Sequence, residues 1–285
     1  MNRRSLLVSL AAAGATIVGA LIEKSAQADD LSVPARAGRL GVAAIDLHNG
    51  RVIQHDGNGR YPLASTFKLP LVMDVLARVD RGTERLDRVV RFSADDLHAY
   101  SPVVGKQPHG GTLTVGELCA AAVEQSDNTA ANLLLRRVGG PEGVTAYLRG
   151  LGDTTTRLDR YEPALNEARV GDPRDTTTPI AMATVLQRLL RDPILSPASK
   201  NTLFGWLRAT TTGTARIRAG VPSTWTVGDK TGTTNSGGND VAILWPPHGS
   251  PIVIAVYFAD VKLSDTARDA TIAATARAVV RRFRD

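Results

Sequence analysis

The sequence predicts an α+β protein with α/β/α layering, in which one antiparallel sheet is built from both ends of the chain and covered by helices. Two observations lead to this prediction. Apolar runs with strand character lie near the start and near the end of the chain, and the long region between them has apolar residues at helical spacing. The middle of the chain is therefore expected to form a mostly helical insertion beside the sheet.

Residues 1–28 have the pattern of an export signal. Arg3 and Arg4 precede an apolar run that is short for a bilayer span, and Ala26-Gln27-Ala28 is a small-x-small cleavage pattern. The arginine pair permits the twin-arginine pathway as well as the general secretory one. Residues 29–285 are then expected to form a monomer, periplasmic or secreted, that has no membrane anchor.

Two strands joined by a tight turn are expected after the signal. Residues 39–47 and 51–55 are β-like runs, and Asn49-Gly50 between them is a strong hairpin signal. Residues 66–79 then carry apolar side chains at helical spacing, with Pro70 early in the run, where a proline costs a helix least. The first long helix is expected there.

The middle of the chain is interpreted as a succession of helices around one long loop. Thr114-Val115-Gly116-Glu117 is a capping-box pattern, which predicts a buried helix over the apolar run that follows. Periodicity is lost between residues 152 and 178, and a loop of this length in a compact protein favours a packed Ω-type loop, here at about 157–175. Further helices are expected at 129–138, 141–149, 179–191 and 197–208.

Strand character returns near the C-terminus. After the last of these strands, an Ala-rich amphipathic helix is expected to close the chain at 264–284. Residues 29–62 and 210–285 are expected to form an α/β half, and residues 63–209 the helical half. The β-like runs of the C-terminal segment lie at 224–230, 240–245 and 251–259.

Composition excludes several functional classes. The net charge of +6 is mild, and no basic, aromatic-interleaved stretch indicates a nucleic-acid partner. The single cysteine, Cys119, cannot form an intrachain disulfide, and its apolar surroundings predict a buried thiol. The five histidines form no pair at metal-ligand spacing, so neither a metal nor another cofactor is expected.

Ser65 and Lys68 form the first chemically informative pattern. Residues three apart on a helix share a face, so the lysine amine is expected beside the serine hydroxyl. A serine becomes a nucleophile when its proton is removed, and a lysine of lowered pKa can remove it. The helix start also offers backbone N–H groups to an oxyanion. Because this spacing also arises by chance on surfaces, its interpretation depends on the rest of the chain.

Three further motifs follow in order: Ser126-Asp127-Asn128, then Glu162-Pro163-Ala164-Leu165-Asn166, then Lys230-Thr231-Gly232-Thr233. Together with the Ser65 motif, they resemble those of the class A serine β-lactamases, within the penicillin-recognising enzymes. The resemblance extends from the first hairpin to the last helix and implies a β-lactamase/transpeptidase-like fold. It also implies hydrolysis of the β-lactam ring of penicillins and cephalosporins through a serine acyl-enzyme, which gives antibiotic resistance.

The resemblance assigns the catalytic roles. Ser65 is implied to be the nucleophile, and Ser126 to carry a proton to the departing lactam nitrogen with help from Lys230. Glu162 is implied to activate, together with a neighbouring amide, the water that hydrolyses the acyl-enzyme. Either Lys68 or Glu162 is the base in acylation, and the sequence leaves both open.

The resemblance also implies the substrate contacts. Asn166 is the amide that positions the water with Glu162, and Asn128 is implied to hold Lys68 and the substrate's side-chain amide. Arg216 is either a substitute guanidinium for the substrate carboxylate or a surface arginine, and Tyr100 either lines the mouth of the pocket or packs as an ordinary tyrosine. The carboxylate of the substrate is implied to contact the third motif, Lys230, Thr231, Gly232 and Thr233. The backbone N–H groups of Ser65 and Thr233 are implied to form the oxyanion hole.

Two further expectations concern the loop and the substrate range. Arg160 and Asp175 match positions that pair across the Ω-type loop in the family. Some relatives that hydrolyse carbapenems carry a disulfide at the positions of Ala64 and Thr234, so that route to carbapenem hydrolysis is absent here.

Two alternative functions share part of this pattern. A cell-wall D,D-peptidase shares the serine–lysine pair, the motif at Ser126 and the motif at Lys230. It generally lacks a loop glutamate such as Glu162 and often carries a membrane anchor. A penicillin-sensing receptor acylates without turnover and normally carries transmembrane helices before its sensor domain.

Overall fold

The computed structural model describes residues 29–30 and 38–284, so the predicted signal at residues 1–28 lies outside the described residues. The centre of the fold is a six-stranded sheet in the order β1-β3-β2-β10-β9-β8. All neighbouring strands are antiparallel except β1 and β3. The strands are β1 (Asp29–Asp30), β2 (Arg39–Asp46), β3 (Val52–His55), β8 (Thr226–Thr234), β9 (Gly237–Trp245) and β10 (Ile252–Ala259).

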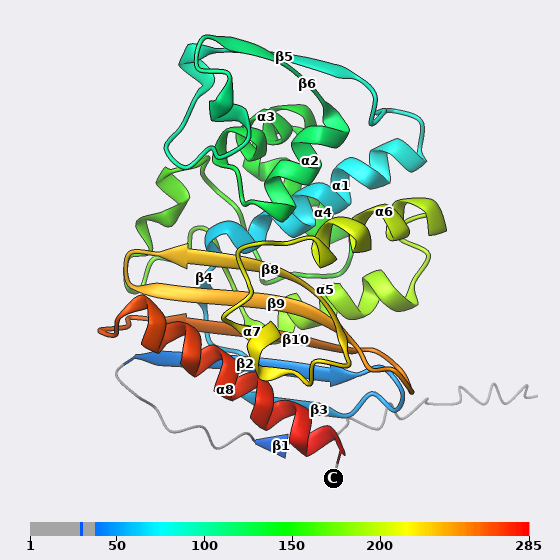
Figure 1. Ribbon diagram of the computed structural model, residues 1–285, viewed down its shortest axis with the longest axis vertical. Coiled ribbons are helices and arrows are strands. Elements are labelled where there is room, and N and C mark those ends of the chain that lie inside the picture. Colours follow the sequence, from blue (N-terminus) through cyan, green and yellow to red (C-terminus); the bar gives the residue numbers. More distant parts are fainter. Residues whose placement is uncertain (1–28, 31–37, 285) are drawn as a thin grey trace, which may run out of the picture.

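Helices cover both faces of this sheet. Helix α8 crosses one face, α5 lies behind the other, and the remaining long helices gather beyond the β8 edge (Figure 1). This arrangement confirms the predicted α+β fold with a sheet from both chain ends. The helices are α1 (Lys68–Asp80), α2 (Val115–Glu124), α3 (Asn128–Val138), α4 (Gly140–Gly150), α5 (Pro179–Arg191), α6 (Pro197–Arg208), α7 (Ile217–Gly220) and α8 (Asp265–Arg284).

Strand β10 shows how the two-residue period of a strand creates two cores. Val253 and Tyr257 face the core that the sheet shares with the helical half, whereas Ile254 and Val256 pack in a separate core beneath α8. Because both faces are covered, the whole strand is apolar and buried.

Shorter elements complete the described chain. One ribbon pairs β4 (Tyr61–Pro62), just before the Ser65 turn, with β7 (Thr176–Thr177), just after the Ω-type loop. Another pairs β5 (Val89–Ser93) with β6 (Gly110–Thr114) at the far tip of the molecule (Figure 1). The 3₁₀ turns are η1 (Ala64–Phe67), η2 (Ala94–Asp96), η3 (Val104–Lys106) and η4 (Ala164–Glu167).

The structure corrects the expected limits of two strands. The run expected to end at Lys230 continues to Thr234 as β8, and the next strand begins at Gly237 rather than Asp240. The polar, glycine-rich residues 231–240 have the composition of a loop. A continuous antiparallel ladder between β8 and β9 nevertheless keeps the two strands extended up to Thr234 and from Gly237. The third motif therefore lies on an edge strand of the sheet.

Other local expectations are confirmed or refined. Gly50, with φ of 76°, closes the expected hairpin between β2 and β3. Cys119 is fully buried, as expected. The first helix is preceded by η1, which contains Ser65, and the β5–β6 ribbon was not expected from the sequence. Within the described ranges, no helix has both the length and the apolar character of a membrane span.

Candidate active site

The turn η1 presents Ser65 to solvent while its neighbours are buried. The Asn239 side chain, from β9, donates to the carbonyls of Pro62 and Leu63 at 2.8 and 3.2 Å, which fixes the segment before the serine. Gly232 of β8 lies against the same turn, and a Cβ there would stand 3.2 Å from the Ser65 nitrogen. The absence of a side chain at Gly232 therefore allows the edge strand to approach Ser65.

Lys68 lies at the centre of the site. Its ammonium donates to Ser65 Oγ at 2.9 Å, to Asn128 Oδ1 at 2.6 Å and to the Ser126 carbonyl at 2.8 Å. Glu162 Oε1 is 3.1 Å from the same nitrogen, and both side chains are fully buried. Burial lowers the pKa of Lys68 from its ordinary value, while the charge of Glu162 opposes this shift.

A second lysine approaches from the edge strand. Lys230 Nζ donates to Ser126 Oγ at 3.0 Å and to the Thr231 carbonyl at 2.8 Å. Lys68 reaches the same Ser126 hydroxyl at 3.4 Å, so the hydroxyl lies between two amines. Burial, with the charge of Lys68 as the next cause, holds the pKa of Lys230 well below its ordinary value. Proton exchange between such amines and a hydroxyl is chemically accessible.

The carboxylate of Glu162 contacts both Ser65 and Lys68. Its Oε1 lies 3.4 Å from Ser65 Oγ, and Asn166 Nδ2 donates to Oε2 at 2.5 Å. Asn132 of α3 fixes the glutamate backbone, because its side chain accepts from the Glu162 N–H at 3.0 Å and donates to the Glu162 carbonyl at 2.9 Å. Asn132 was not predicted as a site residue, although its position one helical turn after Asn128 places it on the same helix face.

The cleft in front of Ser65 has a volume of about 640 Å³. It receives side chains from the helical half, the loop, β8 and α8, which is the concave, mixed setting typical of small-molecule sites. Tyr100 is 61% exposed at its edge, consistent with the expected place at the mouth. The predicted residues that line it are Ser65, Tyr100, Ser126, Asn128, Asn166, Arg216, Thr231, Gly232 and Thr233.

Arg216 lines the cleft but is only 5% exposed. Its guanidinium donates to Thr233 Oγ1 at 2.9 Å, to the Gly232 carbonyl at 2.9 Å and to the Asn239 carbonyl at 2.8 Å. It also pairs with Asp269 of α8 at 2.8 Å. The surface-arginine interpretation is therefore wrong, because these four contacts bury the side chain.

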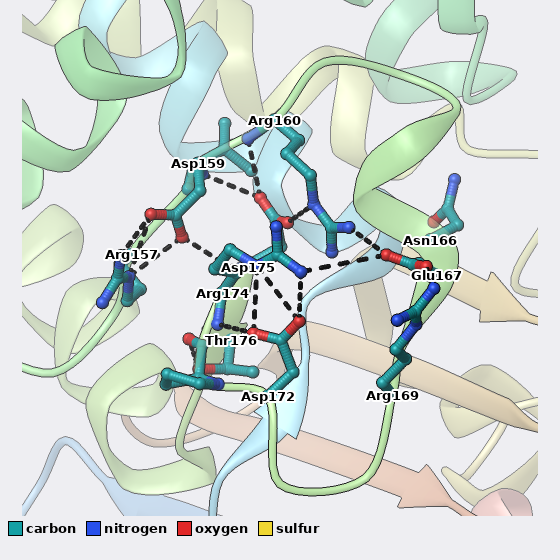
Figure 2. Close-up of polar contacts among 12 residues, drawn as sticks. Arg157, Asp159, Arg160, Asn166, Glu167, Arg169, Asp172, Arg174, Asp175 and Thr176 are labelled. Atoms are coloured by element: carbon teal, nitrogen blue, oxygen red, sulfur yellow. Dashed lines mark hydrogen bonds and ion pairs between the residues drawn. The ribbon is translucent and has the colours of Figure 1, made fainter.

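The segment that carries Glu162 and Asn166 is held by an ionic network (Figure 2). Arg160 Nε lies 2.6 Å from Asp175 Oδ2, which confirms the expected pair. The other oxygen of Asp175 accepts from the backbone N–H groups of Asp159 and Arg160 at 2.7 and 3.0 Å. Asp175 is 1% exposed, so this contact is well shielded from water.

The described part of the chain shows no group of three or more metal-ligating side chains that could hold a metal ion. The site instead consists of two hydroxyls, two amines and one carboxylate. Such a set supports acyl transfer to a serine followed by hydrolysis.

Comparisons with known proteins agree with this chemistry. Residues 24–283 match the model of the β-lactamase enzyme family. β-Lactamase AST-1 of Nocardia asteroides is 44% identical over 98% of this chain and 95% of its own. The carbapenem-hydrolyzing β-lactamase KPC of Klebsiella oxytoca is 46% identical, over 84% of this chain and 82% of its own.

A solved structure of an ancestral (GNCA) class A β-lactamase superposes with a TM-score of 0.85 at 54% identity, covering 87% of this chain and 95% of that one. Family model, curated relatives and solved structure therefore point to one group, and the chain belongs to the class A β-lactamases.

Proposed function

We propose that this class A β-lactamase hydrolyses penicillins and cephalosporins through an acyl-enzyme on Ser65, and so gives resistance to these antibiotics. The observation that carries the proposal is the position of Ser65 Oγ, 2.9 Å from Lys68 Nζ and 3.4 Å from Glu162 Oε1. The hydroxyl, the amine and the carboxylate thus lie in mutual contact, with Lys68 Nζ also 3.1 Å from Glu162 Oε1. The substrate is a small-molecule β-lactam, and no metal or other cofactor takes part in the proposal.

Acylation begins when Ser65 Oγ attacks the lactam carbonyl carbon and loses its proton to Lys68 or to Glu162, directly or through a water. Lowering of the Lys68 pKa by burial favours the amine form that can accept this proton. The carbonyl oxygen becomes an oxyanion between the N–H groups of Ser65 and Thr233. Removal of one such donor typically costs about a hundred- to a thousandfold in rate.

Ring opening breaks the bond between the carbonyl carbon and the lactam nitrogen. Ser126 delivers a proton to that nitrogen and is reprotonated from the amines of Lys68 and Lys230, both within 3.4 Å of its hydroxyl. The substrate carboxylate lies against Lys230, Thr231 and Thr233, and Asn128 binds the side-chain amide of the substrate.

Deacylation distinguishes a β-lactamase from the two alternatives. Glu162 and Asn166 hold a water between them and the ester, and Glu162 accepts its proton as the water attacks the carbonyl carbon. The bond from that carbon to Ser65 Oγ then breaks, and the proton passes to Ser65 Oγ, which restores the free enzyme. Asn132 supports this step by fixing the glutamate backbone from both sides. A D,D-peptidase generally lacks such a loop glutamate, and a penicillin-sensing receptor does not hydrolyse its acyl-enzyme.

Stopped-flow mixing with a chromogenic cephalosporin tests the proposal. The wild-type enzyme is expected to turn over steadily, Glu162→Ala to give a single stoichiometric burst, and Ser65→Ala to give neither. Glu142→Ala, at an exposed carboxylate of α4, is the matched control and is expected to behave as wild type. Steady turnover by Glu162→Ala would contradict the proposed role, and a wild-type burst without turnover would favour the receptor.

We further propose an exported monomer, periplasmic or secreted, that is free of the membrane after removal of residues 1–28. The pattern of an export signal at residues 1–28 supports this proposal. Likewise, we propose an α/β half of residues 29–62 and 210–285 beside a helical half of residues 63–209 that contains the Ω-type loop. Sedimentation velocity and N-terminal sequencing of the secreted product test the oligomeric state and the cleavage site.

A further inference from the structure

A second cavity, of about 180 Å³, lies under the outer limb of the Ω-type loop and outside the cleft. Its walls come from loop residues 168–174, from the approach to β4, from the start of β2 and from the turn after β8. Five arginines and two aspartates line it, and three further carboxylates, Asp56, Glu167 and Asp175, pair with these arginines from outside the lining. The seven charged side chains are Arg39, Arg60, Arg160, Arg169, Arg174, Asp172 and Asp260.

The loop arginines already have carboxylate partners. Arg174 lies 2.6 Å from Asp172, and Arg169 pairs with Glu167 (Figure 2). Arg160 pairs with Asp175, and also with the same Glu167. The three loop arginines therefore face three carboxylates, Asp172, Glu167 and Asp175, so this wall is compensated.

The opposite wall is less well compensated. Within the described chain, no carboxylate lies at ion-pair distance from Arg60, whose guanidinium donates only to the neutral Thr155 carbonyl and to Thr176 Oγ1. Arg39 has carboxylate contacts only at 3.8 Å, to Asp56 and Asp260. The exposed guanidinium of Arg60 is thus the group on this wall that is available to an added anion.

We propose that this cavity binds a tetrahedral oxyanion, phosphate or sulfate, between the loop limb and the sheet. Guanidinium groups form paired, charge-assisted hydrogen bonds with such oxygens. The arginines come from different elements and surround the space, which suits a tetrahedral group better than a planar carboxylate. The cavity also exceeds the roughly 10–15 Å³ that a single water needs, so there is room for a larger occupant.

An anion here would join Arg169 of the loop to Arg60, next to β4. The same loop carries Glu162 and Asn166, so occupancy is expected to brace the segment that forms one wall of the active site. Binding of the anion does not depend on β-lactam hydrolysis, and its failure would leave the proposed function unaffected.

Sodium phosphate is the probe for the first experiment, with ionic strength held constant by sodium chloride. Calorimetric titration is expected to show saturable binding of phosphate. Thermal unfolding in phosphate is expected to show a higher Tm, and hydrogen exchange is expected to be slower at residues 168–174. Sulfate is expected to act similarly and acetate at least tenfold more weakly. Equal binding of acetate would overturn the tetrahedral assignment, and no saturable binding of phosphate would overturn the site.

Single variants from the two walls locate the anion. Arg60→Gln is expected to weaken phosphate binding about tenfold or more, as expected for loss of a charged hydrogen bond. Arg169→Gln is expected to weaken phosphate binding about threefold or more. The Arg169 side chain is 71% exposed, so this variant should fold even if Arg60→Gln does not. Arg91→Gln, at an exposed position of the distant β5, removes the same charge and is expected to bind as wild type.

A further variant separates this cavity from the cleft, where a cation could also attract phosphate. Lys230→Ala removes one of the two buried amines of the active site and is expected to leave the phosphate-dependent rise in Tm intact. Loss of the rise in Lys230→Ala, or an equal loss in Arg91→Gln and Arg60→Gln, would assign the effect to the cleft or to general charge and overturn the proposal.

Discussion

Arg216 shows how one side chain can serve both the cleft and the structure behind it. Its contacts join β8 to β9 and to α8, and one of them fixes the Thr233 hydroxyl that faces the substrate carboxylate in our proposal. We therefore propose that the guanidinium acts on the substrate carboxylate through its own charge and through Thr233.

Arg216→Ala is expected to raise the KM for penicillins by roughly tenfold, the effect of losing one charged hydrogen bond. It should also lower Tm, because the Gly232 and Asn239 carbonyls lose a buried donor. Steady-state kinetics and thermal unfolding measure the two effects. Arg281→Ala, at an exposed position near the end of α8, is the control, and an unchanged KM in Arg216→Ala would refute the carboxylate contact.

At the level of elements, the Ω-type loop depends on buried charge rather than on regular structure. Its only helical segment is the 3₁₀ turn η4, yet Asp175 ties together two backbone N–H groups and Arg160. Surface ion pairs contribute little, but this pair is shielded and multiply hydrogen-bonded. The position of Glu162 therefore depends on a contact at the far end of the loop.

Asp175→Asn is expected to lower the free energy of unfolding by about 1.5–3 kcal/mol, the range for a hydrogen bond to a charged group. Deacylation should slow as well, because Glu162 loses its fixed position. Urea unfolding and single-turnover kinetics measure these effects. Asp172→Asn changes a more exposed pair of the same loop and should have a smaller effect; equal effects would argue against a special role for Asp175.

The strands β8 and β9 hold a buried acidic pair that the sequence analysis missed. Asp240 is fully buried and accepts from the Ile217 N–H at 3.0 Å, while its other oxygen has no partner within the described residues. Burial, with the nearby charge of Asp229 as the next cause, holds the pKa of Asp240 well above its ordinary value.

This shift predicts a specific pH dependence. The folded state binds the Asp240 proton more tightly than the unfolded state, so stability decreases as pH rises from the ordinary pKa of 3.8 through the folded value. Asp240→Asn removes this titration. The free energy of unfolding of the variant, relative to that of the wild type, should therefore increase as pH rises through this range. Urea unfolding at stepped pH measures the difference. Asp87→Asn, at an exposed pair, is the control, and a pH-independent difference for Asp240→Asn would disprove the shift.

At the scale of the whole molecule, the active site joins parts of the chain that are distant in sequence. Lys230 comes from the edge of the sheet, Lys68 from the start of α1, and Glu162 from the loop. The β4–β7 ribbon and the Asn239 contacts to the segment before Ser65 connect the sheet side to the helical side. The site therefore requires both sides to be in place at once.

Unfolding is accordingly expected to be cooperative, with activity and far-UV circular dichroism lost at the same urea concentration. Hydrolysis of a chromogenic cephalosporin in each urea solution supplies the first curve and spectroscopy the second. Loss of activity at a clearly lower urea concentration, with secondary structure intact, would show that the two sides separate before either unfolds.

The sequence by itself determined the fold class, the hairpin at Gly50 and the main chemical groups of the site. These features follow from local periodicity, turn residues and short motifs, which a single stretch of chain carries. The sequence also indicated the Arg160–Asp175 pair, but only through resemblance to a family, since nothing local joins residues so far apart.

Only the tertiary structure decided the extension of β8 through Thr234, the clamp of Asn132 on Glu162 and the burial of Arg216. It also decided the raised pKa of Asp240 and the arginine-lined cavity under the loop. Each of these depends on which side chains from other elements surround a residue. Burial and charge compensation are therefore properties of the packed molecule, and no local pattern of residues encodes them.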